Sequence, residues 1–179
     1  MAYTEIIFSG FGGQGVMAMG QTLAETGMRE GLNVSWLPSY GPEMRGGTAN
    51  CSVVVADSEI ISPTVSEPTV LVAMNQPSLA KFAASVRPGG HIFVNSTVVN
   101  EKVTRDDVTV HYVDCGRIAA DLGNHRVANM VMLGAVVGAT KLMDLKAVQN
   151  MMSEIFTGRK AKLVRLNVDA IQNGADSVS

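Results

Sequence analysis

A regular alternation of short β-rich segments with longer helical segments is the feature that most constrains the fold. Runs rich in valine, isoleucine and aromatic residues predict six strands: Thr4–Ser9, Asn33–Leu37, Cys51–Val55, Val70–Met74, His91–Asn95 and Val108–Val113. Segments of helical pattern predict helices at Val16–Glu30, Pro77–Val86, Gly116–Leu122, Val127–Thr140 and Leu145–Phe156. This order is typical of an α/β protein with a layered, mostly parallel and possibly mixed sheet flanked by helices.

The first strand and helix are joined by a glycine cluster, so the first βαβ unit is expected to be Rossmann-like. Gly10, Gly12, Gly13, Gln14 and Gly15 belong to a G-x-G-x-x-G pattern. Glycines allow a tight turn and a close backbone approach, and the free N–H groups that open a helix attract anions. The plainer alternative is a turn that only lets the helix pack on the strand.

A dinucleotide site makes a further demand that this sequence does not meet. It needs an acidic residue about 20 residues beyond the glycines, at the end of the second strand, to bind the ribose. Residues 35–40 contain no carboxylate, and the first one that follows is Glu43. An NAD(P)-dependent dehydrogenase or another nucleotide-binding α/β protein is therefore kept only as the alternative to an anion-binding or partner-binding surface.

The loop after the second strand has the most unusual composition, S-Y-G-P-E-M-R-G-G-T. If the first two strands run parallel, this loop and the glycine turn lie at the same edge of the sheet. Arg45 can present a bidentate fork to a carboxylate or phosphate, whereas a plain surface loop would pair it with Glu43. The candidate site residues in this loop are Tyr40, Glu43, Arg45, Gly46 and Gly47.

A third candidate segment opens the helix at 127–140. Asn124 is a suitable N-cap. Arg126 and Asn129 are three residues apart and share one helix face, where they could hold an anion together with free N–H groups. Residues 130–139 are apolar nearly all round, which predicts a helix buried in the core or against another subunit.

Composition narrows the possible functions. Two cysteines far apart in the chain cannot by themselves form a four-ligand zinc site or hold an iron–sulfur cluster. A net charge of −2 without a basic block argues against nucleic-acid binding. The absence of a signal peptide or a bilayer-length apolar stretch predicts a soluble cytoplasmic protein of one domain, residues 1–179, whose last residues, 173–179, fray. Because no nucleophile, metal or P-loop motif occurs, no catalytic or metal-binding residue is assigned.

Four separated motifs resemble a known family. They are I-I-F-S-G-F-G-G-Q-G-V from Ile6, S-Y-G-P-E-M-R-G-G-T-A-N-C from Ser39, M-N-Q-P-S-L from Met74, and N-x-R-x-x-N-M-V-M-L-G-A from Asn124. Together they resemble the gamma subunit of 2-oxoacid:ferredoxin oxidoreductases. The Tyr-Gly-Pro-Glu-Met-Arg-Gly-Gly form is most like the 2-oxoglutarate type, or the branched-chain type, and less like the pyruvate type.

The resemblance implies a multisubunit enzyme that converts a 2-oxoacid and coenzyme A to an acyl-CoA and CO2 and passes electrons to ferredoxin or another acceptor. It implies that thiamine diphosphate, Mg and iron–sulfur clusters belong to the alpha, beta and ferredoxin-like delta partners, and that this chain binds none of them alone. We expect residues 10–15 and 40–47 to face those partners near the coenzyme A or substrate entrance, with Arg45 or Arg126 beside an anionic group. A free-standing flavodoxin-like electron carrier is a third interpretation.

Overall fold

The computed structural model describes residues 3–40 and 48–179, and within them the chain forms one six-stranded sheet in the order β2-β3-β1-β4-β5-β6. The strands are β1 (Thr4–Phe11), β2 (Asn33–Tyr40), β3 (Thr48–Ala56), β4 (Val70–Ala73), β5 (His91–Asn95) and β6 (Thr109–Val113). β1, β4, β5 and β6 pair in parallel, whereas β3 is antiparallel to both of its neighbours, β1 and β2. The prediction of an α/β fold with a mostly parallel, possibly mixed sheet is confirmed, and the sheet is mixed.

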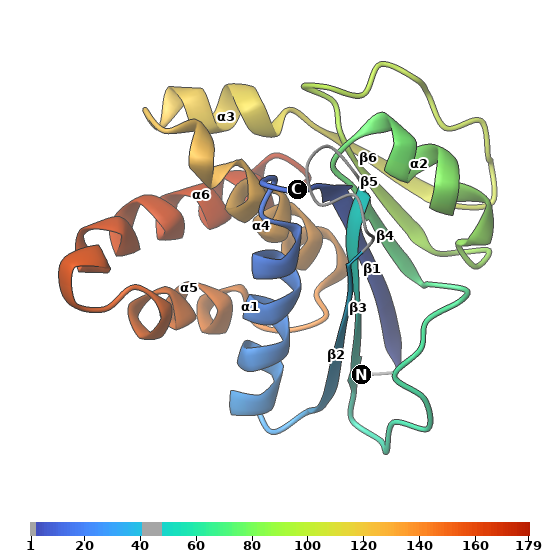
Figure 1. Ribbon diagram of the computed structural model, residues 1–179, viewed down its shortest axis with the longest axis horizontal. Coiled ribbons are helices and arrows are strands. Elements are labelled where there is room, and N and C mark those ends of the chain that lie inside the picture. Colours follow the sequence, from blue (N-terminus) through green and yellow to red (C-terminus); the bar gives the residue numbers. More distant parts are fainter. Residues whose placement is uncertain (1–2, 41–47) are drawn as a thin grey trace.

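Helices cover the two faces of this sheet unequally. They are α1 (Val16–Arg29), α2 (Gln76–Phe82), α3 (Cys115–Asp121), α4 (Ala128–Thr140), α5 (Leu145–Ile155) and α6 (Val164–Asp176), with 3-10 turns η1 (Ala83–Ser85), η2 (His125–Val127) and η3 (Gly158–Leu163). Figure 1 shows α1, α4, α5 and α6 on one side of the sheet and α2 on the other. The predicted helix 77–86 is shorter than expected, because α-helical geometry ends at Phe82 and η1 follows.

The strand pattern explains why there are two cores. Ile6 and Phe8 of β1 belong to the large core under α1 and α4, whereas Ile7 between them belongs to the small core under α2. Successive side chains of a strand point to opposite faces, so a strand that is apolar at every position must be covered on both sides. The first strand therefore lies in the middle of the sheet, as its burial requires.

Helices α4 and α6 pack more closely against each other than the other described helix pairs do. A Cβ atom at Gly134 would meet the carbonyl oxygen of Ile171, and a Cβ atom at Gly174 would meet that of Val131, so the two backbones touch. Every residue from 130 to 138 is buried in the core, as the apolar pattern predicted. The expectation that residues 173–179 fray is wrong, because α6 continues to Asp176 with Gly174 and Ala175 buried against α4.

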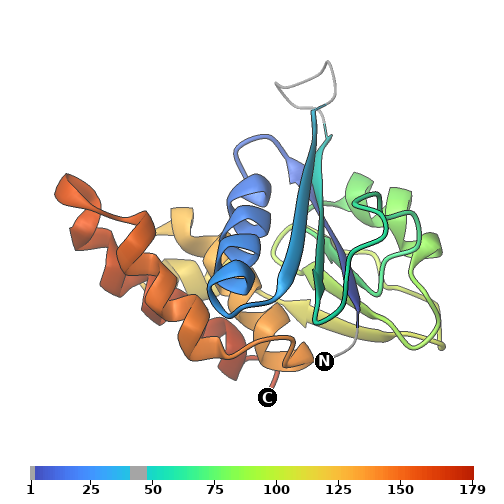
Figure 2. The same cartoon turned by 90° about the horizontal axis from the view of Figure 1, so that it is seen from below.

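The ends of β1 and β2 lie at the same edge although the strands are not neighbours. Gly10 of β1 and Tyr40 of β2 both lie opposite Ala49 of β3. Two strands antiparallel to the same neighbour run in the same direction, and Figure 2 shows both pointing to one side. The predicted common edge is thus present, whereas Glu43, Arg45, Gly46 and Gly47 lie outside the described residues.

Candidate functional site

The glycine turn between β1 and α1 is shaped by its backbone. Gly13 and Gly15 have φ values of 92° and 74°, in the left-handed region that glycine adopts without strain. Gly10 is buried, and a Cβ atom there would come within 2.7 Å of the Gln14 Oε1 atom. A larger residue at any of these three positions would force the turn to change.

The side chain of Gln14 fastens this turn to the end of β4. Its Oε1 atom accepts hydrogen bonds from the Phe11 N–H at 2.7 Å and from the Asn75 side-chain amide at 3.4 Å. Its Nε2 atom donates to the Met74 carbonyl at 3.0 Å. Gln14 was predicted as a candidate ligand or subunit-contact residue. In the structure both ends of its side chain bind within the chain.

Buried polar side chains that were not among the predicted site residues surround this contact. Asn75 accepts the Ser78 N–H at 2.9 Å and so caps α2, while the Asn95 amide donates to the Met74 carbonyl at 3.5 Å. Ser9 donates to the Ser78 hydroxyl at 2.8 Å. Ser9, Met74 and Asn95 stand at the ends of β1, β4 and β5. The Asn-x-Pro start of α2 was the available signal, because it combines a capping side chain with a proline in the first turn.

This network lies where an α/β sheet normally binds its ligand. α1 and α2 leave neighbouring parallel strands, β1 and β4, toward opposite faces of the sheet. The crevice outside the carboxyl ends of strands at such a switch point is the common ligand position in open α/β sheets. On its other side, β1 borders the antiparallel strand β3 and not β2. In a dinucleotide-binding fold the strand that carries the ribose-binding carboxylate lies next to β1, so this strand order further disfavours the NAD(P) alternative.

The structure brings the third candidate segment to the glycine turn. The Asn129 side-chain amide donates to the Gly15 carbonyl at 3.4 Å, and a Cβ atom at Gly15 would collide with the Asn129 side chain. Asn124 accepts the Arg126 N–H at 3.0 Å and so caps the 3-10 turn η2, whereas the helix that it was predicted to cap, α4, has Val127 at its N-cap. Arg126 is exposed, and within residues 3–40 and 48–179 no carboxylate forms an ion pair with it.

A cavity of about 290 Å³ opens beside this contact. We call it the α1–α6 cavity. It is lined by Ala18, Thr22, Asn124, Arg126, Val127, Asn129, Met130, Ile155, Phe156, Leu163, Leu166 and Asn167. Arg126 and Asn129 therefore share one cavity, next to the first turn of α1.

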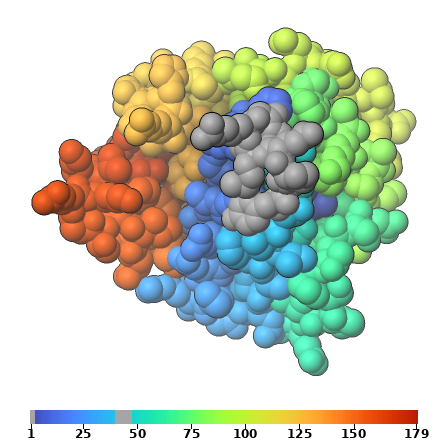
Figure 3. Space-filling model, viewed as in Figure 1, coloured from blue at the N-terminus to red at the C-terminus, as the bar shows by residue number. Residues whose placement is uncertain are grey.

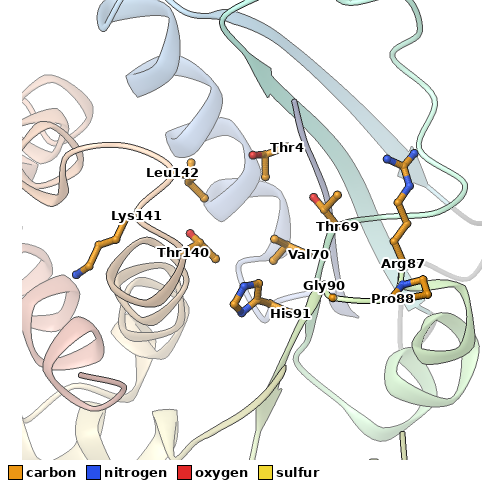
Figure 4. Close-up of a pocket in the computed structure, with 11 residues that line it drawn as sticks. Thr4, Thr69, Val70, Arg87, Pro88, Gly90, His91, Thr140, Lys141 and Leu142 are labelled. Carbon is orange, nitrogen blue, oxygen red and sulfur yellow. The ribbon is translucent and has the colours of Figure 1, made fainter. Parts of the chain in front are cut away.

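A second cavity, of about 360 Å³, lies at the opposite edge, near the starts of β1, β4 and β5 (Figure 4). Its Arg87 binds Glu5 at 2.6 Å and points away from Lys141. His91 contacts His111 through ring nitrogens 3.1 Å apart, and partial burial lowers the pKa of both imidazoles. The positively charged side chains of Arg87 and Lys141 do not converge on a common point. We therefore place the candidate site at the opposite edge of the sheet, where the carboxyl ends of β1 and β4 lie.

The cysteines do not suit the binding of a metal cluster. Cys51 is buried beneath Gly20, and burial raises the pKa of its thiol to about 11. Burial raises the pKa of the Cys115 thiol as well. A cluster ligand must be a thiolate, which both environments disfavour. In the part of the chain that the structure describes, no three His, Cys, Asp or Glu side chains gather as metal ligands. None of the helices described there is long and apolar enough to cross a bilayer.

Fold and site together define a class: an α/β chain whose switch point carries a fastened glycine turn, with an exposed arginine in the cavity beside it. The chain belongs to the pyruvate ferredoxin/flavodoxin oxidoreductase family, which matches residues 5–177. It is similar to solved gamma subunits of this family, so the resemblance drawn from the four motifs is confirmed. One is the keto/oxoacid ferredoxin oxidoreductase gamma subunit of Geobacter sulfurreducens, with a TM-score of 0.84, 29% identity and 98% of each chain covered.

Two curated relatives from Methanothermobacter marburgensis are also similar. The ketoisovalerate oxidoreductase subunit VorA is 42% identical over 170 residues, which cover 94% of this chain and 35% of VorA. The 2-oxoglutarate synthase subunit KorC is 34% identical over 182 residues, covering 97% of this chain and 96% of KorC. The chain thus spans about a third of VorA and nearly the whole of KorC.

Proposed function

We propose that this chain is the gamma subunit of a multisubunit 2-oxoacid:ferredoxin oxidoreductase, in which it supports the coenzyme A-dependent oxidative decarboxylation of a 2-oxoacid to an acyl-CoA and CO2. The observation that carries the proposal is the end-to-end similarity to KorC. It is supported by the amide side chains, glycines and exposed arginine that the described residues bring together at and beside the carboxyl ends of the strands. Thiamine diphosphate, Mg and iron–sulfur clusters would be held by alpha, beta and ferredoxin-like delta subunits, and the electrons would leave to ferredoxin.

Within that complex the carboxyl edge of the sheet would face the catalytic subunits. Gly12 and Gly13 are exposed, and a Cβ atom at Gly13 would meet nothing within 4 Å, so a ligand or partner backbone has free access there. Arg126 supplies an exposed positive charge near this turn, with no ion-pair partner among the described residues, and Arg45 would supply a second. The chain's own contribution is then to position an anionic group and to exclude water from the entrance.

We propose 2-oxoglutarate as the substrate, on the form of the motif at 40–47 and on the coverage of KorC. Ketoisovalerate is the second candidate, because the identity to VorA is higher. A tagged chain purified from its native cells should bring down a complex containing thiamine diphosphate and iron. With coenzyme A and a viologen acceptor, that complex should oxidise 2-oxoglutarate faster than ketoisovalerate. The reverse preference would assign the branched-chain substrate.

The same preparation tests the competing interpretations. The isolated chain should be colourless, bind no nicotinamide nucleotide and turn over no 2-oxoacid. Nicotinamide binding by the isolated chain would support the dehydrogenase alternative, and a yellow chain would support the electron carrier. A chain that purifies without thiamine-dependent partners would contradict the proposed function.

Substitution of Arg126 and Arg45 tests the proposed role of the carboxyl edge of the sheet. In the complex, Arg126→Ala and Arg45→Ala should each raise the KM for coenzyme A about tenfold with little change in kcat, because a charge-assisted contact to an anion contributes about 1.5 kcal/mol. Arg165→Ala is the matched control, since that exposed arginine is paired with Asp169 at 2.9 Å. Normal assembly, coenzyme A affinity and turnover in Arg45→Ala or Arg126→Ala would remove that residue from the proposed site.

A further inference from the structure

We infer that the α1–α6 cavity is a docking site for an acidic segment of a catalytic subunit, which inserts one large apolar side chain into it. This inference rests on the proposed function, since the occupant belongs to the complex. Three properties of the described residues support it: apolar walls of limited volume, a basic border, and a direct link to the glycine turn.

The walls of the cavity suit a side-chain anchor better than a small molecule. Partly exposed side chains, among them Ile155 at 37%, Phe156 and Leu166, leave apolar surface open to solvent. The volume of about 290 Å³ is at the lower end of the range of roughly 300–1,000 Å³ for small-molecule sites. A buried aromatic or aliphatic anchor in such a pocket is the usual centre of a protein interface.

Each of the three asparagine side chains of the cavity uses one of its two polar groups in a hydrogen bond within the chain. The Asn124 side chain accepts the Arg126 N–H, the Asn129 amide donates to Gly15, and the Asn167 amide donates to the Leu163 carbonyl at 2.9 Å. A small ligand needs several free polar groups that fix its orientation. Among the described residues of the lining Arg126 is the one charged side chain, and a single guanidinium does not by itself fix the orientation of a small ligand.

The border of the cavity is basic although the whole chain has a net charge of −2. Exposed Arg159, Lys160 and Lys162 stand on η3, whose last residue, Leu163, lines the cavity. Among the described residues none of these three cations, nor Arg126, has an ion-pair partner. Unpaired charges of one sign around an apolar pocket select a partner of the opposite sign and speed its association.

The cavity is also connected to the candidate site. Asn129 lines it and binds the Gly15 carbonyl, and Ala18 lines it from the first turns of α1. In Figure 3 the orange-red part of the chain that contains η3 projects at the left of the molecule, and the blue residues of α1 lie nearer its centre. A segment docked between them would therefore hold the glycine turn and η3 in one position.

Two variants with matched controls test this docking in the reconstituted complex. Ala18→Phe fills the cavity from an exposed helical alanine, and Ala80→Phe makes the same change on exposed α2. Lys160→Glu/Lys162→Glu reverses the charge of the border. Its control, Lys81→Glu/Lys146→Glu, makes the same charge change at exposed helical positions outside the lining.

The measured quantity is the dissociation constant of the chain from the thiamine-containing subunits, with circular dichroism to confirm folding. We expect the two test variants, Ala18→Phe and Lys160→Glu/Lys162→Glu, to weaken binding about tenfold or more, as loss of an interface anchor does. Both controls should bind like the wild type. The charge-reversed variant should also lose most of the salt dependence of association. Wild-type affinity in both test variants would overturn the docking site while leaving the subunit assignment intact. Failure of the wild-type chain to bind those subunits would overturn both.

Discussion

The crossing of α4 and α6 and the turn between β1 and α1 both depend on glycine, for opposite reasons. At the crossing, Gly134 and Gly174 have ordinary helical geometry, and the missing side chain lets two backbones touch in an apolar interior. At the turn, Gly13 and Gly15 supply a left-handed backbone; the space beside Gly15 is taken by the Asn129 amide, and the space beside Gly13 is open. At the α4–α6 crossing, glycine allows tight packing of the core. At the β1–α1 turn, glycine allows a backbone shape that leaves part of the sheet edge exposed to solvent.

This contrast separates what holds the molecule together from what it can offer a partner. The crossing has no exposed surface, so changes there should act on folding alone. The turn is partly exposed and its polar groups bind one another, so changes there should act on both stability and assembly. Substitutions ordered from the crossing to the tip of the turn test this separation.

The largest effect should come from Gly174→Ala. The new Cβ atom would collide with the Val131 carbonyl, which belongs to rigid helix backbone, so the helices must move apart. We expect a loss of at least about 3 kcal/mol in the free energy of unfolding, since overpacking of a tight core is costly. Urea denaturation measures it. Ala80→Gly on exposed α2 is the control and should cost about 1 kcal/mol from helix propensity. A Gly174→Ala chain as stable as the wild type would show that the crossing is loose.

Gly15→Ala should rank second, at about 2 kcal/mol, because it combines left-handed strain with a collision against Asn129. Gly31→Ala isolates the strain, since Gly31 has a φ of 78° and a Cβ atom there would meet nothing within 4 Å. Thermal unfolding gives the loss in the free energy of unfolding for each variant. The difference between the two losses is the cost of displacing Asn129. Equal losses would mean that the contact from α4 does not constrain the turn.

Gln14→Leu should cost about 1.5 kcal/mol, because it removes the side-chain partner of the Phe11 N–H and of the Met74 carbonyl. Gln21→Leu is its counterpart on the exposed surface of α1, where the glutamine binds only Glu25, and it should change stability little. Hydrogen exchange at the Phe11 amide gives a local measurement. We expect faster exchange in Gln14→Leu, and protection equal to the wild type would show that the side chain does not fasten the turn.

Much of the fold follows from local patterns, and the missing parts depend on contacts between distant segments. The strand His91–Asn95 has the predicted bounds, and the buried helix after Asn129 was evident from its apolar pattern. Periodicity says nothing about pairing direction, so the position of β3 between β1 and β2 could not be predicted. The helical end of α6 was missed because Gly174 and Ala175 pack against Val131 and Gly138 of another helix.

The site shows the same limit. The glycine turn was visible because its chemistry is local, and the Asn124 cap was visible for the same reason. The role of Gln14 depends on Met74 and Asn75, which lie about sixty positions further along the chain. The role of Asn129 depends on Gly15, at a separation of 114 positions. Sequence motifs therefore marked segments that the structure brings close together, but they could not show which side chains are engaged inside the chain.

The smallest effect on stability should come from Gly13→Ala, at the exposed tip of the turn, and it decides what the turn is for. A Cβ atom there would meet nothing, so only the left-handed φ of 92° opposes it, at a cost of about 1 kcal/mol. Gly89→Ala, with a φ of 80° and equally open surroundings at the opposite edge, should cost the same. If the turn only packs the helix on the strand, complexes carrying either variant will have the same KM for coenzyme A. If a ligand or partner backbone approaches the turn closely, Gly13→Ala alone will raise that KM, because its methyl group occupies the free space that the approach requires.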